Sequence, residues 1–118
     1  MNILRQAAIF LSATDSLLDT TEQEVKDFLA SFLREFPDVL VVSTKELVKE
    51  CYDQWAINLP SPQMFDIMGR VKKRQSIQEA LLQYMIGNPA FTYRQGAKGG
   101  WRINRKVFFQ AQADIITV

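Results

Sequence analysis

The residues of this 118-residue chain that could do chemistry are mainly its cations. Residues 70–106 carry nine Lys and Arg side chains and one acidic residue, Glu79, whereas residues 1–69 carry five basic and eleven acidic side chains. A cationic segment in a chain of net charge +1 is typical of a protein that presents one face to a polyanion. A dipolar surface without function is the alternative. Aromatic residues and glycines are interleaved with the cations, which favours polyanion binding.

Catalytic and metal-binding residue types are scarce. The chain has no histidine and one cysteine, Cys51, which excludes imidazole catalysis, the common zinc sites and a disulfide within the chain. Cys51 falls on an apolar helix face with no histidine to activate it, so we expect a buried, inert thiol. Glu46, Glu50 and Asp53 fall on an exposed helix face and do not form an acid–base pair. We therefore expect a non-enzyme that needs no metal or cofactor.

Composition and hydropathy predict one cytoplasmic globular domain over residues 1–118. Hydrophobic residues make up 47% of the chain and charged residues 23%, which is enough to bury a core. No apolar run approaches the roughly 20 residues that span a bilayer, and residues 1–11 are too short for a secretory signal. We expect no membrane association.

The first half of the sequence reads as helices separated by a short strand. Residues 2–11 have helical spacing, and Thr21 with Glu24 forms a capping box that opens a helix ending at Pro37. The apolar run 39–42 suits a brief buried strand. Ser43 and Glu46 then form a second capping box, and the helix that follows shares one apolar face: Leu47, Val48, Cys51, Tyr52 and Trp55.

Residues 61–86 continue helically. Ser61 is a good N-cap and Pro62 suits the first helical position. The expected core stripe is Met64, Ile67, Met68 and Val71. The opposite, exposed stripe is Gln63, Asp66, Arg70 and Lys73, followed by Arg74. A third capping box, Ser76 with Glu79, leaves open whether this segment is one helix or two, and Gly87 is expected to end it.

From Phe91 the hydrophobic period changes to two, which indicates a β-hairpin. Residues 91–94 and 101–104 alternate apolar and polar side chains around a loop that holds three glycines and Lys98. Arg94 and Arg102 fall on the polar side, so the predicted hairpin is cationic. The apolar tail, residues 107–118, is expected to form a last strand and makes a homodimer a state to test.

The order of these elements resembles the winged helix-turn-helix arrangement over about residues 21–106. Several segments also resemble the winged-helix region at the C-terminal end of phage and plasmid primase-helicases: Ser43-Thr44-Lys45-Glu46-Leu47, Tyr52-x-x-Trp55, Pro60-Ser61 with Phe65, and Gly99-Gly100-Trp101-Arg102-Ile103. The fold expected is α+β, mostly helical, with a C-terminal β-hairpin wing. One departure is an apparent extra helix at residues 76–86, between the recognition helix and the wing, which leaves open which helix reads DNA.

The resemblance implies a transcriptional regulator or replication accessory factor of a phage or mobile element. In this family a helix enters the major groove of double-stranded DNA and the wing contacts the backbone or minor groove. The cations expected to neutralise phosphates are Arg70, Lys73, Arg74, Arg94, Lys98 and Arg102. Gln63 suits a bidentate contact with adenine, and Ser61 a phosphate contact at a helix N-terminus.

A protein-interaction module is the rival hypothesis. In that case the scaffold docks a partner protein, such as a nucleic-acid enzyme that it inhibits, through the acidic N-terminal half. The absence of salt-dependent DNA binding by the unmodified protein would favour the protein-interaction hypothesis over the DNA-binding hypothesis.

Overall fold

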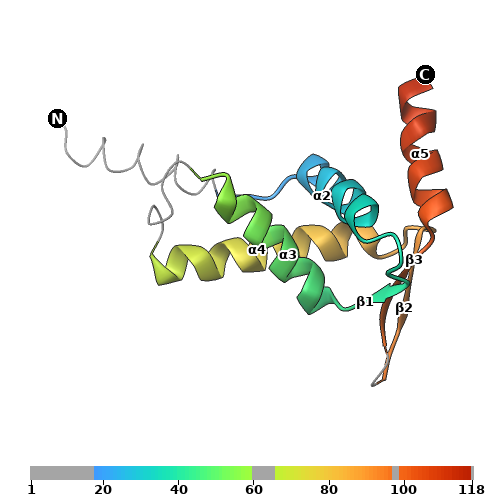
Figure 1. Ribbon diagram of the computed structural model, residues 1–118. Coiled ribbons are helices and arrows are strands. Elements are labelled where there is room, and N and C mark those ends of the chain that lie inside the picture. Colours follow the sequence, from blue (N-terminus) through green and yellow to red (C-terminus); the bar gives the residue numbers. More distant parts are fainter. Residues whose placement is uncertain (1–17, 60–65, 97–98, 118) are drawn as a thin grey trace.

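The computed structural model describes residues 18–59, 66–96 and 99–117, with side chains described as far as residue 111. Within these residues the chain forms a mostly helical α+β fold with four helices and a three-stranded antiparallel sheet (Figure 1). The helices are α2 (Glu22–Glu35), α3 (Thr44–Ile57), α4 (Ile67–Met85) and α5 (Arg105–Thr117), and the strands are β1 (Val41–Val42), β2 (Phe91–Arg94) and β3 (Gly100–Ile103). The expectations for residues 2–11, Ser61, Pro62, Gln63 and Lys98 lie outside the described residues.

Helix α2 begins and ends with specific polar contacts. The predicted capping box is present: the Glu24 amide donates to the Thr21 hydroxyl at 3.1 Å, and the Thr21 amide donates to the Glu24 carboxylate at 3.3 Å. At the other end, the Arg105 guanidinium donates to the carbonyls of Leu33, Phe36 and Val39 at 2.6, 2.7 and 2.7 Å. The bond to Leu33 satisfies a carbonyl of the last turn of α2, those to Phe36 and Val39 hold the segment that follows, and together they join this region to α5. Arg105 is therefore a structural cation.

Helix α3 follows the sequence prediction in part, because Tyr52 and Trp55, also expected on its apolar face, are half-buried. The Ser43 hydroxyl accepts from the Glu46 amide at 3.1 Å, which confirms the predicted N-cap. The buried face carries Leu47, Val48 and Cys51, at the spacing that an amphipathic helix requires.

Helix α4 differs from its prediction in start and in phase. It is one continuous helix whose N-cap is Asp66, because the Asp66 carboxylate accepts from the Gly69 amide at 2.9 Å. Asp66 therefore caps α4 and does not belong to an exposed stripe within the helix. The Ser76–Glu79 capping box was also wrong, since α4 runs through both residues. Gly87 follows the helix with a φ of +79°, a conformation that favours glycine, which confirms the predicted end.

The buried stripe of α4 is Gly69, Lys73, Ile77, Leu81 and Met85, not Met64, Ile67, Met68 and Val71. Ile67 is 78% exposed, and Met68 and Val71 are also exposed, while Met64 lies outside the described residues. One continuous helix can bury only one face, and its longer C-terminal part packs Ile77, Leu81 and Met85 against α2 and α3. That packing turns the apolar residues of the first turns outward.

The sheet has the order β1-β3-β2, and β2 and β3 form the predicted hairpin. Phe91 opposes Ile103 and Tyr93 opposes Trp101 on the face toward the helices, whereas Thr92 opposes Arg102 on the outer face. The expected final strand was wrong, because residues 105–117 form α5. Asn104 accepts from the Val107 amide at 3.1 Å as a helix N-cap does, and Phe108 is buried.

The core lies where α2, α3 and α4 meet the inner face of the sheet. Figure 1 shows α3 and α4 crossing, with the hairpin projecting away from the helices at the end where α3 begins. Within residues 18–59, 66–96 and 99–117, no helix has the length and apolar character needed to cross a bilayer.

Candidate nucleic-acid interface

The exposed side of the α3–α4 pair contains a groove of about 670 Å³, which we call the α3–α4 groove. Its lining includes three cations, one carboxylate and four other residues: Lys45, Lys49, Arg74, Asp53, Thr44, Val48, Tyr52 and Gln78. The Trp101 indole N–H donates to the Thr44 hydroxyl at 2.8 Å, which joins the start of α3 to β3. The hairpin and this end of the groove are thus held in a defined relation.

Arg74 is a cation of the groove that stacks on an aromatic ring. Its Cζ lies 4.4 Å from the centroid of the Tyr52 ring, so the guanidinium stacks on an aromatic face while its side chain remains exposed. This cation–π contact limits the rotamers of Arg74 and leaves its N–H donors available to an incoming anion.

Lys45 and Lys49 face the same groove from α3. Both are exposed, and they are one helical turn apart. The Lys49 ammonium lies 3.9 Å from the Asp53 carboxylate, a surface ion pair that solvent weakens. The groove therefore carries a net positive charge, with three cations and one carboxylate.

The predicted cations of the described residues divide between α4 and the hairpin. Arg70 and Arg74 are exposed on α4, and Arg94 and Arg102 are exposed on the hairpin. Arg102 lies on the outer face of the sheet, where it borders a separate hollow with Leu40 and Thr92. The structure thus joins Arg74 to α3 cations and sets Arg102 apart from the α3–α4 groove. The remaining sites, Ser61, Gln63 and Lys98, lie outside the described residues.

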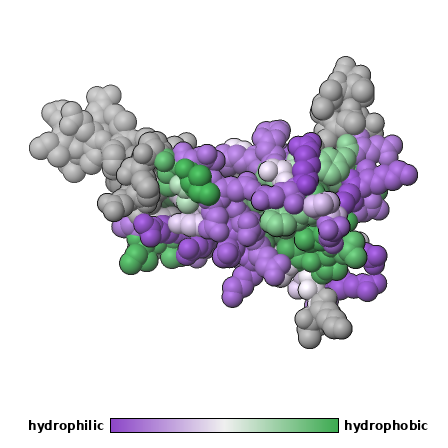
Figure 2. All heavy atoms as spheres, in the orientation of Figure 1, coloured by the Kyte–Doolittle hydropathy of each residue, from purple (hydrophilic) through white to green (hydrophobic). Residues whose placement is uncertain are grey.

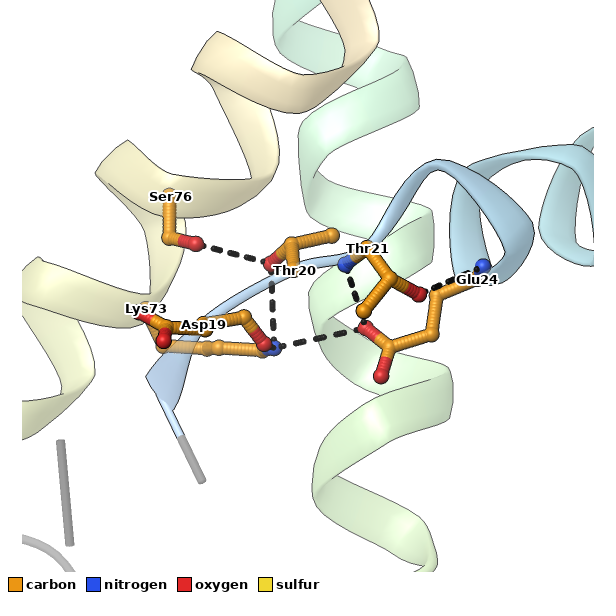
Figure 3. Close-up of polar contacts among 6 residues, drawn as sticks. All are labelled: Asp19, Thr20, Thr21, Glu24, Lys73 and Ser76. Carbon is orange, nitrogen blue, oxygen red and sulfur yellow. Dashed lines mark hydrogen bonds and ion pairs between the residues drawn. The ribbon is translucent and has the colours of Figure 1, made fainter. Parts of the chain in front are cut away.

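Lys73 is not on an exposed stripe, which corrects the sequence prediction. Its side chain is 2% exposed, and its ammonium donates to the Asp19 carbonyl and the Thr20 hydroxyl, each at 3.0 Å (Figure 3). The Glu24 carboxylate lies 3.9 Å away, and the centroid of the Trp55 ring 5.1 Å away. Lys73 therefore ties α4 to the segment that precedes α2 and is not available to a phosphate.

Burial lowers the pKa of Lys73 below its ordinary value, and the charge of Glu24 opposes that effect. Ser76, predicted as an N-cap, belongs to the same cluster, since its hydroxyl donates to the Thr20 hydroxyl at 2.9 Å. We call Lys73, Asp19, Thr20, Glu24 and Ser76 the Lys73 cluster. Its contacts are those of a structural anchor.

Lys45, Lys49 and Gln78 are the groove residues that sequence reasoning missed. The signal for the lysines was present: they lie four residues apart on the side of α3 opposite Leu47 and Cys51, which were correctly expected in the core. The charge excess of residues 70–106 indicated a binding surface in that segment, whereas both lysines occur in the acidic half of the sequence.

In the part of the chain that the structure describes, no cluster of three or more Cys, Asp or Glu side chains could hold a metal ion. Comparison of this chain with known protein families, curated proteins and solved structures finds no match. The geometry of the α3–α4 groove is thus the basis on which function is inferred.

Proposed function

We propose that this protein is a winged helix-turn-helix domain that binds double-stranded DNA. The order α2-β1-α3-α4-β2-β3 and the sheet order β1-β3-β2 support this proposal. The apparent extra helix before the wing was the one departure from the family arrangement. Residues 67–85 form a single helix, which supports our assignment of α4 as the recognition helix and of the β2–β3 hairpin as the wing.

The observation that carries the proposal is the α3–α4 groove with its three cations. In the proposed complex, Lys45 and Lys49 at the start of α3 and Arg74 on α4 neutralise phosphates of one DNA strand. Arg70, one helical turn before Arg74, extends the footprint along α4, and the exposed Arg94, on the outer face of the hairpin, supplies a separate backbone contact from the wing. Lys73 takes no part.

Base recognition is assigned to the amides on the exposed side of α4. Gln75 and Gln78 are exposed there, and Gln78 lines the groove. A glutamine amide can both donate to and accept from adenine in the major groove. The proposed role is that of a transcriptional regulator or replication accessory factor encoded by a phage or mobile element and acting in the cytoplasm.

Fluorescence anisotropy with a labelled 20-base-pair duplex tests this function. The variant Lys45→Ala/Lys49→Ala should bind the duplex roughly tenfold more weakly, because it loses two phosphate contacts of about 0.5 to 1 kcal/mol each. The control Lys26→Ala/Lys106→Ala removes the same charge from α2 and α5 and should bind as the unmodified protein does. Equal losses of duplex affinity in both variants would show that net charge alone explains the effect and would refute DNA binding at the α3–α4 groove.

A further inference from the structure

A second groove lies on the other side of α3, beside strand β1. It has a volume of about 330 Å³ and is bordered by α2, β1 and α3. We call it the β1 groove, and its lining is Phe32, Phe36, Val39, Val41, Val42, Glu46, Lys49 and Glu50. The nearby surface is unusually apolar: Leu40 is 69% exposed, Val41 42% and Phe36 37%.

Figure 2 shows this apolar character as hydrophobic residues gathered at the sheet end of the molecule, while the middle of the same face is hydrophilic. Exposed large apolar side chains next to one another mark interaction sites more often than scattered ones do. The patch is thus a candidate for contact with another protein.

Strand β1 gives the patch an open hydrogen-bonding edge. Among the described residues, the sheet order β1-β3-β2 places β1 at an edge, where it pairs with β3 alone. In an antiparallel pair, successive residues alternate between bonding the partner strand and directing their N–H and C=O groups away from it. One residue of β1 therefore offers its backbone groups to an additional strand.

The charge of the β1 groove selects the kind of strand. Glu46 and Glu50 border it from α3. Lys49 also lines it, and its ammonium lies 3.9 Å from the carboxylate of Asp53, which with Lys49 lines the α3–α4 groove as well. Glu35 and Asp38 flank Phe36 in the chain and are exposed. The rim is thus acidic around an apolar floor, which complements an apolar segment flanked by basic residues.

We propose that the β1 groove binds an extended segment of a partner protein in which apolar residues alternate with Lys or Arg. The segment adds a strand to the free edge of β1, one apolar side chain enters the space between Phe32, Phe36 and Val42, and basic side chains pair with Glu46 and Glu50. Helix α3 runs between this groove and the α3–α4 groove, and Lys49 lines both, so the proposed partner site adjoins the proposed DNA site.

Selection of a displayed library of random twelve-residue peptides against the full chain supplies the probe. The enriched peptides should alternate apolar and basic residues. The synthesised peptide should bind Glu46→Gln/Glu50→Gln at least tenfold more weakly than the unmodified protein. It should bind the control Glu22→Gln/Asp27→Asn equally well, because that variant loses the same charge from the surface of α2.

Backbone methylation of the peptide tests strand addition independently of any variant. Methylation of alternate peptide nitrogens should abolish binding in one register and spare it in the other, because a strand adds through one edge only. Equal affinity for both double variants, tolerance of methylation in both registers, or no enriched peptide would overturn the proposal. A dimer of the chain that excludes the peptide would assign the groove to a second copy and overturn it as well.

Discussion

Lys73 and Arg74 are neighbours in the sequence, yet one side chain of α4 is buried and the other is exposed. Lys73 is buried in the Lys73 cluster near Trp55, whereas Arg74 is exposed and stacks on Tyr52. Helix α3 shows the same contrast between adjacent residues. Cys51 and Lys73 line one pocket, whereas Tyr52 lines the α3–α4 groove. Each helix thus contributes one residue of each adjacent pair to the interior and the other to the groove.

The difference shows that a cation-rich segment is not itself a binding surface. Of the nine cations between residues 70 and 106, Lys73 and Arg105 are bound to backbone carbonyls, while Lys45 and Lys49 join the groove from the acidic half. The phase of each helix, which the core determines, decides which cations face solvent. Variants at positions 73 and 74 test this division directly.

Loss of Lys73 should produce the largest effect. Lys73→Ala removes a buried aliphatic stem and leaves the Asp19 carbonyl without its donor, so the free energy of unfolding should fall by about 2 to 3 kcal/mol. Lys73→Met retains most of the stem and should recover about half of that loss. Urea denaturation of both variants measures the effect. A loss below about 0.5 kcal/mol for Lys73→Ala would contradict the anchoring role.

The buried thiol of Cys51 should make the free energy of unfolding depend on pH. Burial raises the pKa of its thiol from 9.0 to about 11, an effect that Lys73 partly opposes. The unfolded chain therefore loses this proton first, and the free energy of unfolding should fall as the pH rises from 9 to 11, by about 2 kcal/mol at most.

Cys51→Ala should lack this component, so its unfolding free energy should fall less steeply over that pH range. The difference between the two proteins is the relevant quantity, because Lys73 and Tyr84 also have shifted pKa values and titrate in both. Parallel pH profiles would show that the thiol is not buried as described.

Arg74 should have a smaller effect that appears in binding rather than in folding. Arg74→Ala should weaken duplex binding roughly fivefold and lower the unfolding free energy by less than about 1 kcal/mol, the value of an exposed cation–π contact. Lys73→Met should show the reverse pattern, with lower stability and unchanged affinity. Anisotropy and urea titrations on the same preparations distinguish the two variants. A loss of duplex affinity in Lys73→Met but not in Arg74→Ala would contradict the assignment of binding to Arg74 and of stability to Lys73.

The smallest effect on duplex affinity is expected from two carboxylates of α3. Glu50→Gln/Asp53→Asn should leave duplex affinity unchanged or slightly raised, because Asp53 no longer competes for Lys49 and long-range repulsion of phosphate weakens. Affinity is measured by the same anisotropy titration, with circular dichroism to verify the fold. A several-fold loss of affinity in a folded variant would show that these carboxylates assist DNA binding and would contradict the account.

Local signals made much of the fold predictable. The Thr21 capping box, the Ser43 N-cap and the alternation from Phe91 each depend on residues close in sequence, and each was correct. Helix α5 was missed because the apolar tail was taken for a strand. Asn104, whose side chain accepts from the Val107 amide, was the cap that could have indicated a helix.

The phase of α4 could not be predicted locally. Its first turns carry apolar residues on one side and its later turns on another, and tertiary packing decides between them. Packing buries Ile77 and Leu81 and therefore also Lys73, whose partners Asp19 and Thr20 lie more than 50 residues away. The wrong phase of α4 placed Lys73 in the predicted DNA-binding site, although Arg74 was correctly predicted to be exposed.

The salt dependence of duplex binding tests the central claim most directly. If Lys45, Lys49 and Arg74 act with the other exposed cations of α4 and the hairpin, four to six phosphates are neutralised, and log affinity should fall against log salt with a slope of roughly −4 to −5. Arg74→Ala should flatten that slope by about one, and Lys73→Met should leave it unchanged. The absence of salt-dependent binding to any duplex at micromolar protein, or a flattened slope in Lys73→Met with none in Arg74→Ala, would contradict the account.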